Sequence, residues 1–308
     1  MLASQTAWAG RVAIFDYDKR ARFPAALSRH IEKQLKALTD DIAVSHYTAE
    51  GSEARAVKIL SDLDQEGLDL IILITSDALI IAQHTLLKTP ALYTNVNNPK
   101  ILGFRTLGPP GGNISGVSYY IPVENHLRIY KAIMPGLHQL GFLFDRHNQS
   151  RKAEVPEART ACADLGLIFD SEFVERSGQL RHAVAMLITR GADAIVAASS
   201  DVIYEHISAF LDITDAAGKP VFSFYKAGVS EGAVAALSSD YFQMADSCLI
   251  PMARKVLLDN VSPGDMPVAF LKQKKLFLNT CQAEKLGLEI PLQILVATHE
   301  LEVEEICR

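Results

Sequence analysis

The sequence has no apolar run long enough to cross a membrane and no basic pattern typical of a nucleic-acid-binding protein. A membrane-spanning helix needs roughly 18 to 20 apolar residues, whereas the most strand-like apolar run, Leu70–Ile74, fits a buried strand. The net charge is -6, and binding to nucleic-acid phosphates requires a basic face. The one basic cluster, Lys272, Lys274 and Lys275, is too short to provide it. These absences predict a globular protein that binds no nucleic acid.

Patterns typical of metal and redox sites are also missing. The four cysteines, Cys162, Cys248, Cys281 and Cys307, lie far apart in the sequence. Zinc sites and redox dithiols need closely spaced pairs, so we expect these residues to be packing groups or free thiols. The nine histidines contain no close pair at ligand spacing. We therefore predict no metal site and no cofactor.

Motifs of catalysis and nucleotide binding are absent as well. The chain has no Gly-x-Ser-x-Gly, no Gly-Lys-Ser/Thr loop, no His-Glu-x-x-His and no Gly-x-Gly-x-x-Gly after its first strand. Where a dinucleotide-binding fold would place its glycines, this chain has Asp16-Tyr17-Asp18-Lys19. Gly111-Gly112-Asn113 has no following lysine and is interpreted as a tight turn. We predict that the protein is not an enzyme.

What the sequence does contain is a regular alternation of apolar and amphipathic segments. A chain of 308 residues with 49% hydrophobic composition can fill two cores. Short apolar runs alternating with longer amphipathic stretches indicate parallel sheets covered by helices. We therefore predict an α/β fold of two similar Rossmann-like lobes with parallel sheets.

The alternation runs twice, with a segment rich in proline and glycine at 108–116 between the two halves. In the first half we expect strands at 12–15, 42–47, 70–74 and 91–94, and helices at 24–38, 52–65 and 78–86. In the second half we expect strands at 139–144, 167–174, 194–197, 220–224 and 233–238, and helices at 151–166, 178–190, 202–217 and 242–258.

Ligands of open parallel sheets bind outside the carboxyl ends of the strands. The polar and aromatic residues at or near these ends are the predicted ligand-binding residues: Asp16, Tyr17, Thr75, Ser76, Asn95, Asn97, Tyr119, Asn148, Ser199, Ser200, Asp201, Phe224, Tyr225 and Asp240. Hydroxyls and helix N-termini suit a carboxylate, Asp201 or Asp240 suits an ammonium, and the tyrosines suit an apolar side chain.

Each of these residues also has a purely structural interpretation, which the sequence leaves open. The serines, Thr75 and Asp240 are typical helix N-caps. The asparagines before Pro99 are typical turn formers, and the tyrosines are often packing groups.

Several segments, in order, resemble one known family. They are Asp69–Ser76, Pro90–Pro99, Gly111-Gly-Asn-Ile-Ser-Gly-Val-Ser118, Met134–Leu137, Gly232–Ala235 with Asp240-Tyr241, Leu278-Asn279, Leu286–Leu288 and Ile290-Pro291. Across nearly its whole length the chain resembles the ABC transporter substrate-binding family, which includes tryptophan- and tyrosine-importer proteins and has a type I periplasmic-binding fold. Asn98 stands where the family usually has aspartate, and Asp16-Tyr17-Asp18 replaces a more usual apolar, His-containing loop. These departures leave the identity of the solute open, and it need not be tryptophan.

The resemblance implies an extracytoplasmic solute-binding protein that captures an amino acid or aromatic-like solute in a cleft between lobes and docks on an ABC permease. It implies a first lobe of 10–116 with about 241–260, a second lobe of 117–237, and a C-terminal segment, 261–308, packing across both. We expect a monomer that is periplasmic or anchored outside the cell, and Ala7-Trp8-Ala9 has the form of a signal-peptidase site. The alternatives are a ligand-sensing module for a membrane signalling partner and a racemase-like enzyme.

Overall fold

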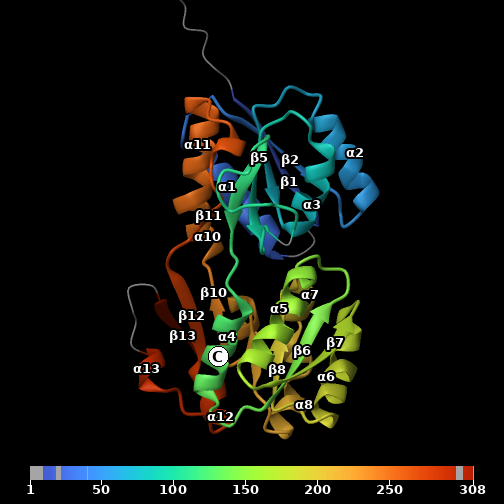
Figure 1. Cartoon of the computed structure of the whole chain (residues 1–308), viewed down its shortest axis with the longest axis vertical. Helices are drawn as coiled ribbons and strands as arrows, with labels where there is room; N and C mark the ends of the chain where they lie inside the picture. Colours follow the sequence, from blue (N-terminus) through green and yellow to red (C-terminus); the bar gives the residue numbers. More distant parts are fainter. Residues whose placement is uncertain (1–9, 19–21, 40, 101, 296–300, 308) are drawn as a thin grey trace, which may run out of the picture. The chain divides into compact units, whose positions relative to one another are not determined.

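The protein was analysed as a computed structural model, which describes residues 10–18, 22–39, 41–100, 102–295 and 301–307. The chain divides into two compact units, Met1–Tyr120 with Tyr241–Leu271, and Ile121–Asp240 with Lys272–Arg308 (Figure 1). The segment 241–260 thus belongs to unit 1, and 261–308 is divided between the two units instead of forming a segment of its own. The expected signal-peptidase site, Ala7-Trp8-Ala9, lies outside the described residues.

Unit 1 contains a parallel sheet in the order β11-β5-β4-β3-β1-β2. Its strands are β1 (Arg11–Asp16), β2 (Ala43–Thr48), β3 (Leu70–Ile74), β4 (Ala91–Val96), β5 (Ile114–Ser118) and β11 (Ala269–Phe270). All five residues of β3 are buried, as expected for a strand covered on both faces. Strand β5 lies so close to β4 that a Cβ atom at Gly116 would be 2.3 Å from the Tyr93 carbonyl oxygen.

The unit 1 helices lie on both faces of this sheet. They are α1 (Arg22–Lys36), α2 (Glu53–Leu63), α3 (Ser76–Thr85), α10 (Tyr241–Met244) and α11 (Ile250–Asp259), with a π-helical turn at Ala245–Leu249 and a 3₁₀ turn at Pro263–Asp265. Residues of α2 and α3 form one core cluster with Phe15, Leu73 and Tyr93. Helix α1 contacts β1 and α11, and α11 contacts β3. Because side chains alternate along a strand, Ile14 and Asp16 face the side opposite to Phe15, which is the side of α1.

Unit 2 contains a seven-stranded sheet in the order β13-β12-β10-β9-β8-β6-β7. Its strands are β6 (Gln139–Asp145), β7 (Ile168–Val174), β8 (Ala194–Ala197), β9 (Val221–Ser223), β10 (Ala235–Ser238), β12 (Lys274–Asn279) and β13 (Leu301–Ile306). All neighbouring pairs are parallel except β10 and β12, which are antiparallel. The expected parallel core is therefore present, and the C-terminal part adds two strands at one edge.

Unit 2 has four helices that the sequence did not predict, at Val123–Ile133, Lys226–Ser230, Thr280–Lys285 and Leu292–Leu295, and one predicted helix is broken. The helices of this unit are α4 (Val123–Ile133), α5 (Arg151–Asp164), α6 (Leu180–Thr189), α7 (Asp201–Tyr204), α8 (Leu211–Ala216), α9 (Lys226–Ser230), α12 (Thr280–Lys285) and α13 (Leu292–Leu295), with 3₁₀ turns at Ser177–Gln179 and Ile207–Ala209. The single helix expected at 202–217 is wrong, because this stretch folds as α7, a 3₁₀ turn and α8. Phe210, directly before α8, is fully buried. We infer that packing of this side chain is favoured over one continuous helix.

The expectation of packing or free thiols is wrong for two of the four cysteines. Cys281, in α12, and Cys307, directly after β13, form a disulfide with a sequence separation of 26 residues. Cys162 is buried in α5, and burial raises the pKa of its thiol to about 12, which fits the packing role expected for it. The wide spacing of 281 and 307 in the sequence does not indicate a disulfide. The two cysteines come together because each follows one of the strands β12 and β13, which pair in the folded chain.

Candidate functional site

The carboxyl ends of the unit 1 strands bring the predicted residues of this unit into adjacent positions. Asp16 of β1, Ile74 of β3 and Thr94 of β4 are in register across three neighbouring strands. The residues that follow are therefore neighbours too: Tyr17 after β1, Thr75 after β3 and Asn95 beside Thr94. This edge is where ligands of open parallel sheets bind.

The backbone of this edge has a positive φ at two predicted residues. Thr75 has φ 89°, which is strained for a β-branched residue, whereas Asn95 has φ 54°, a left-handed value that asparagine tolerates. The hydroxyl oxygens of Thr75 and Thr94 are also buried without a hydrogen-bond partner among the described residues. Thr75 occupies the N-cap position of α3, yet its side chain makes no capping hydrogen bond. A simple capping role therefore does not account for this residue.

Ser76, Asn97 and Tyr119 belong to a network next to this row. The Ser76 hydroxyl accepts a hydrogen bond from the Asn97 backbone N–H at 3.2 Å, and both residues are buried. The Ser118 hydroxyl donates to the carbonyl oxygens of Val96 and Asn97 at 3.0 and 2.9 Å. The Tyr119 ring lies 5.4 Å from that of Tyr241. The network fixes the ends of β4 and β5 relative to α3.

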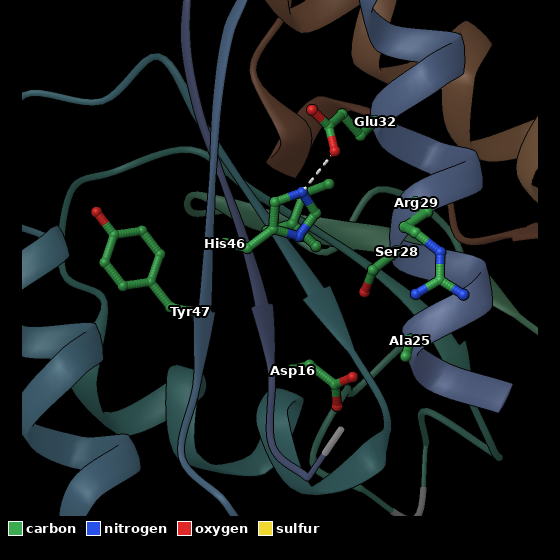
Figure 2. Close-up of a pocket in the computed structure, with 8 residues that line it drawn as sticks. Asp16, Ala25, Ser28, Arg29, Glu32, His46 and Tyr47 are labelled. Carbon is green, nitrogen blue, oxygen red and sulfur yellow. Dashed lines mark hydrogen bonds and ion pairs between the residues drawn. The ribbon is translucent and has the colours of Figure 1, made fainter. Parts of the chain in front are cut away.

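Asp16 is 2% exposed and lines a pocket of about 250 Å³ that lies within unit 1. The pocket lies between α1 and the strands β1 and β2, and its walls are formed by Ile14, Asp16, Ala25, Ser28, Arg29, Glu32, His46 and Tyr47 (Figure 2). Ser28, Arg29 and Glu32 come from α1, and His46 is in register with Ile14. Charged and polar groups from two strands and one helix therefore line one pocket.

At one end of this pocket, His46 and Glu32 are joined by a hydrogen bond. The His46 Nε2 atom lies 2.8 Å from Glu32 Oε2, and Figure 2 shows the bond. Lys36 lies 2.6 Å from the other oxygen of Glu32. Hydrogen bonds from Lys36 and His46 lower the pKa of Glu32, so this carboxylate is already neutralised by the protein.

In unit 2, Asn148, Ser199 and Ser200 follow the ends of β6 and β8, which are neighbours in the sheet. The Ser200 hydroxyl donates to Asp145 Oδ2 at 2.8 Å, and the Ser199 backbone N–H donates to Glu154 Oε2 at 3.1 Å. Both acceptor residues are buried. Asn148 accepts the Ser150 backbone N–H at 2.8 Å. This edge of unit 2 is thus organised around two buried carboxylates.

Phe224, Tyr225 and Asp240 follow the neighbouring strands β9 and β10. Both aromatic residues are buried. Burial raises the pKa of Tyr225 well above its usual value, and the charges of Asp201 and Asp240 add to the effect. Asp240 lies 3.5 Å from the ammonium group of Lys275. Asp201, Tyr225 and Asp240 thus share one electrostatic environment.

A buried histidine supports the aromatic part of this edge. The His126 ring, in α4, lies 4.4 Å from the Phe224 ring. Burial lowers the pKa of His126 to about 3, so the imidazole is neutral, and its Nδ1 atom has no hydrogen-bond partner among the described residues. The neighbouring Tyr130 hydroxyl donates to the Ser223 carbonyl oxygen at 2.7 Å. These contacts hold the end of β9 and the residues that follow it.

Sequence reasoning missed the groups that depend on helix packing. Asp145 is the last residue of a correctly expected strand and could have been included by extending it by one residue. Glu154, His126 and Arg29 lie within helices, and nothing in their spacing separates them from surface charges. The ligand contacts of the predicted residues themselves stay predictions.

The fold can now be compared with solved structures. An ABC domain in complex with L-Trp from Streptococcus pneumonia is 20% identical, with a TM-score of 0.83 over 96% of this chain and 100% of that chain. A myo-inositol binding protein from Caulobacter is 14% identical, with a TM-score of 0.63 over 91% of this chain and 98% of that chain. Two mainly parallel α/β units of this kind define the class of type I periplasmic-binding-like proteins, which confirms the predicted fold class.

The family follows from the sequence match. The model of the family described as ABC transporter substrate binding protein matches residues 29–302, and this chain belongs to that family. A curated relative, the tyrosine-binding protein of Clostridioides difficile (strain R20291), is 22% identical over 241 residues, which are 78% of this chain and 69% of that protein. The predicted resemblance and the predicted role in solute binding are confirmed, and the role implies an ABC permease as partner.

Proposed function

We propose that this protein captures an amino acid, with aromatic amino acids as the first candidates, and delivers it to its permease without chemical change. The relatives support the solute class, since one is named for tyrosine and another was solved with L-Trp. The observation that carries the proposal is the end of β3 and β4, where Thr75 is strained and the hydroxyls of Thr75 and Thr94 have no hydrogen-bond partner among the described residues. Strain and unsatisfied polar groups persist where they serve binding.

The fourteen residues predicted from the sequence are the proposed solute contacts. They supply hydroxyl, amide, carboxylate and aromatic groups, which is the chemistry that an amino acid requires.

We place the protein outside the cytoplasm, as a periplasmic or membrane-anchored monomer that binds no nucleic acid. The disulfide between Cys281 and Cys307 supports this location, because disulfides persist in oxidising compartments. No helix in the described part of the chain is long and apolar enough to cross a membrane.

The test is a thermal-shift screen against amino acids, aromatic metabolites, nucleosides and sugars. A true solute at a hundredfold excess over its Kd stabilises the protein by about 2.7 kcal/mol. Ser76→Ala and Tyr225→Ala should each reduce the shift, measured against the ligand-free midpoint of the same variant. Ser61→Ala, on the exposed face of α2, is the matched control and should leave the shift unchanged. A flat screen with the wild-type protein would contradict the proposed function.

A further inference from the structure

The carboxylate of Asp240, two residues after β10, lies beside a lysine of the neighbouring strand β12. Its Oδ2 atom is 3.5 Å from the ammonium nitrogen of Lys275, and the two side chains are 19% and 16% exposed. Ser238, the last residue of β10, is in antiparallel register with Lys275, so the pairing of the strands brings the lysine to this end of β10. The attraction that Asp240 exerts on a cation therefore depends on Lys275.

The same lysine contacts a second carboxylate, from β13. Glu302 Oε2 lies 3.6 Å from the Lys275 ammonium nitrogen, and the two residues are register partners in the parallel pair of β12 and β13. Strand β12 lies between β10 and β13 in the sheet (Figure 1). One ammonium group is thus shared between Asp240 and Glu302. Because a cation shared between two anions lies less close to either of them, Glu302 limits how far Lys275 neutralises Asp240.

Strand β12 also contacts the residue before Asp240. The Lys274 ammonium group donates to the Ser239 hydroxyl oxygen at 3.2 Å, and Ser239 is buried. Asp240 in turn acts on Tyr225, because its charge helps to raise the pKa of the Tyr225 hydroxyl. The lysines of β12 therefore belong to the electrostatic environment of the residues that follow β9 and β10.

The register that brings Glu302 to Lys275 is supported by the disulfide. It joins Cys281, two residues after β12, to Cys307, directly after β13. A shift of β13 by one residue would turn Glu302 to the other face of the sheet, because side chains alternate along a strand. A covalent link at the end of this strand pair opposes such a shift.

We propose that Lys275 and Glu302 are specificity-determining residues of the solute site, which set how strongly Asp240 attracts the ammonium group of an amino acid. Lys275 competes with that ammonium group for Asp240, and Glu302 limits the competition by holding the lysine from the other side. The proposal rests on the proposed function and on the expectation that Asp240 meets the ammonium group.

Two variants remove the two charges, and they should change the affinity in opposite directions. Lys275→Met keeps an apolar chain and should bind L-tyrosine about 3- to 10-fold more tightly, because Asp240 loses a competing cation. Glu302→Gln should bind it about 2- to 5-fold more weakly, because Lys275 then pairs with Asp240 alone. Calorimetry on the full chain at low ionic strength measures both Kd values. Loss of packing would weaken binding in both variants, so opposite signs distinguish an effect of charge.

An analogue without the ammonium group tests which part of the solute responds. 3-(4-Hydroxyphenyl)propionic acid should gain no affinity in Lys275→Met and lose none in Glu302→Gln, since it brings no cation to Asp240. Asp240→Asn with Lys275→Met should bind L-tyrosine no more tightly than Asp240→Asn alone, because the gain requires the carboxylate. At an ionic strength of about 1 M, where the screening length is about 3 Å, both changes should shrink. If another amino acid gives the larger thermal shift, it is used with its own deaminated analogue.

Two control variants change the same residue types at the opposite end of β10. Lys285→Met alters a lysine of α12 that lies 2.6 Å from Asp215, and Glu231→Gln alters a carboxylate that accepts the Ser208 hydroxyl at 3.0 Å. Both should leave the Kd for L-tyrosine unchanged. Circular dichroism checks the fold of each variant. Glu302 is 45% exposed, so Glu302→Gln should fold as the wild type does and tests the proposal by itself.

The outcomes separate this proposal from the proposed function. If the wild-type protein binds an amino acid and the two variants change its Kd in the same direction or not at all, the role of Lys275 and Glu302 is overturned and the proposed function stands. The role is also overturned if the gain in Lys275→Met persists with the propionic acid or beside Asp240→Asn. If the wild-type protein binds no amino acid, the proposed solute class fails and this proposal fails with it.

Discussion

In each unit a central strand is followed by three polar residues, but the two sets of residues differ in hydrogen bonding and in backbone strain. Thr75-Ser76-Asp77 follows β3, and Ser199-Ser200-Asp201 follows β8. In unit 2, buried carboxylates accept hydrogen bonds from Ser199 and Ser200. In unit 1, Thr75 has φ 89° and a buried hydroxyl without a partner among the described residues. The same sequence pattern therefore gives hydrogen-bonded serines at the strand end in unit 2 and a strained threonine at the strand end in unit 1. A ligand that hydrogen-bonds to this threonine can offset the free-energy cost of its strain and burial.

The units also differ in covalent structure. The disulfide ties α12 to the end of β13, and all of these elements belong to unit 2. Among the described residues of unit 1 there is no disulfide, and its strand β3 is buried along its whole length. Perturbations that act on one unit can therefore test whether the units differ in stability as they differ in chemistry.

Reduction of the disulfide should have the largest effect. A cross-link that closes a loop of 26 residues is worth about 3 kcal/mol through the entropy of the unfolded chain. Hydrogen exchange in the presence of dithiothreitol should show faster exchange in β12 and β13 and unchanged exchange in β1 and β3. The double variant Cys281→Ser with Cys307→Ser should behave as the reduced protein and should not respond to dithiothreitol. Equal acceleration in both units would contradict a unit-specific role of the disulfide.

The sequence predicts most strands of both sheets well, including the edge strands β2 and β7, and misses the strands at the opposite edge of each sheet. The apolar runs at β3 and β8 locate these strands to the residue, because strands buried on both faces are continuously apolar. Strand β5 was not predicted, since it lies within the glycine-rich segment and its glycine packs against Tyr93. Strands β12 and β13 were not predicted either, because their lysines and glutamates hide the apolar period and the two strands pair with each other only in the folded chain.

The candidate site follows the same division. Counting strands from the sequence is enough to place Asp16, Thr75 and Asn95 at neighbouring strand ends, because parallel strands end at one edge. It cannot place Arg29, His126 or Glu154, since each lies on a helix whose rotation over the sheet decides what its side chain meets. The strain at Thr75 is likewise a property of the folded backbone and has no signal in the sequence.

Acid should destabilise unit 2 through His126. Burial holds the pKa of His126 at about 3, whereas an unfolded histidine titrates near 6.5. Because the folded pKa is the lower one, the unfolded state binds more protons between these values, and stability is lost as the pH falls from about 6.5 toward 3. The loss between pH 7 and pH 5 should be about 2 kcal/mol. Urea unfolding at both pH values measures it.

A neutral replacement isolates this effect from the other acidic groups. His126→Gln should flatten the dependence of stability on pH in this range by most of that amount. His84→Gln, in α3 of unit 1, is the control and should leave the dependence unchanged. An identical pH dependence in the wild-type protein and His126→Gln would show that another group is responsible.

The smallest effects should come from two fully buried tyrosines, one in each unit. Burial raises the pKa of both hydroxyls, but only the Tyr130 hydroxyl has a hydrogen bond, to the Ser223 carbonyl oxygen at 2.7 Å. Tyr130→Phe should cost about 1 to 2 kcal/mol, because a buried acceptor loses its donor. Tyr93→Phe should cost nothing or stabilise the protein, because the Tyr93 hydroxyl is buried without a partner among the described residues and its desolvation is not compensated. Since both changes remove one oxygen atom from a tyrosine in a sheet core, urea unfolding of the pair measures how far each unit satisfies its buried polar groups. Equal losses would mean that the Tyr93 hydroxyl is hydrogen-bonded in solution, and the contrast between the polar strand ends of the two units would then rest on Thr75 and Thr94 alone.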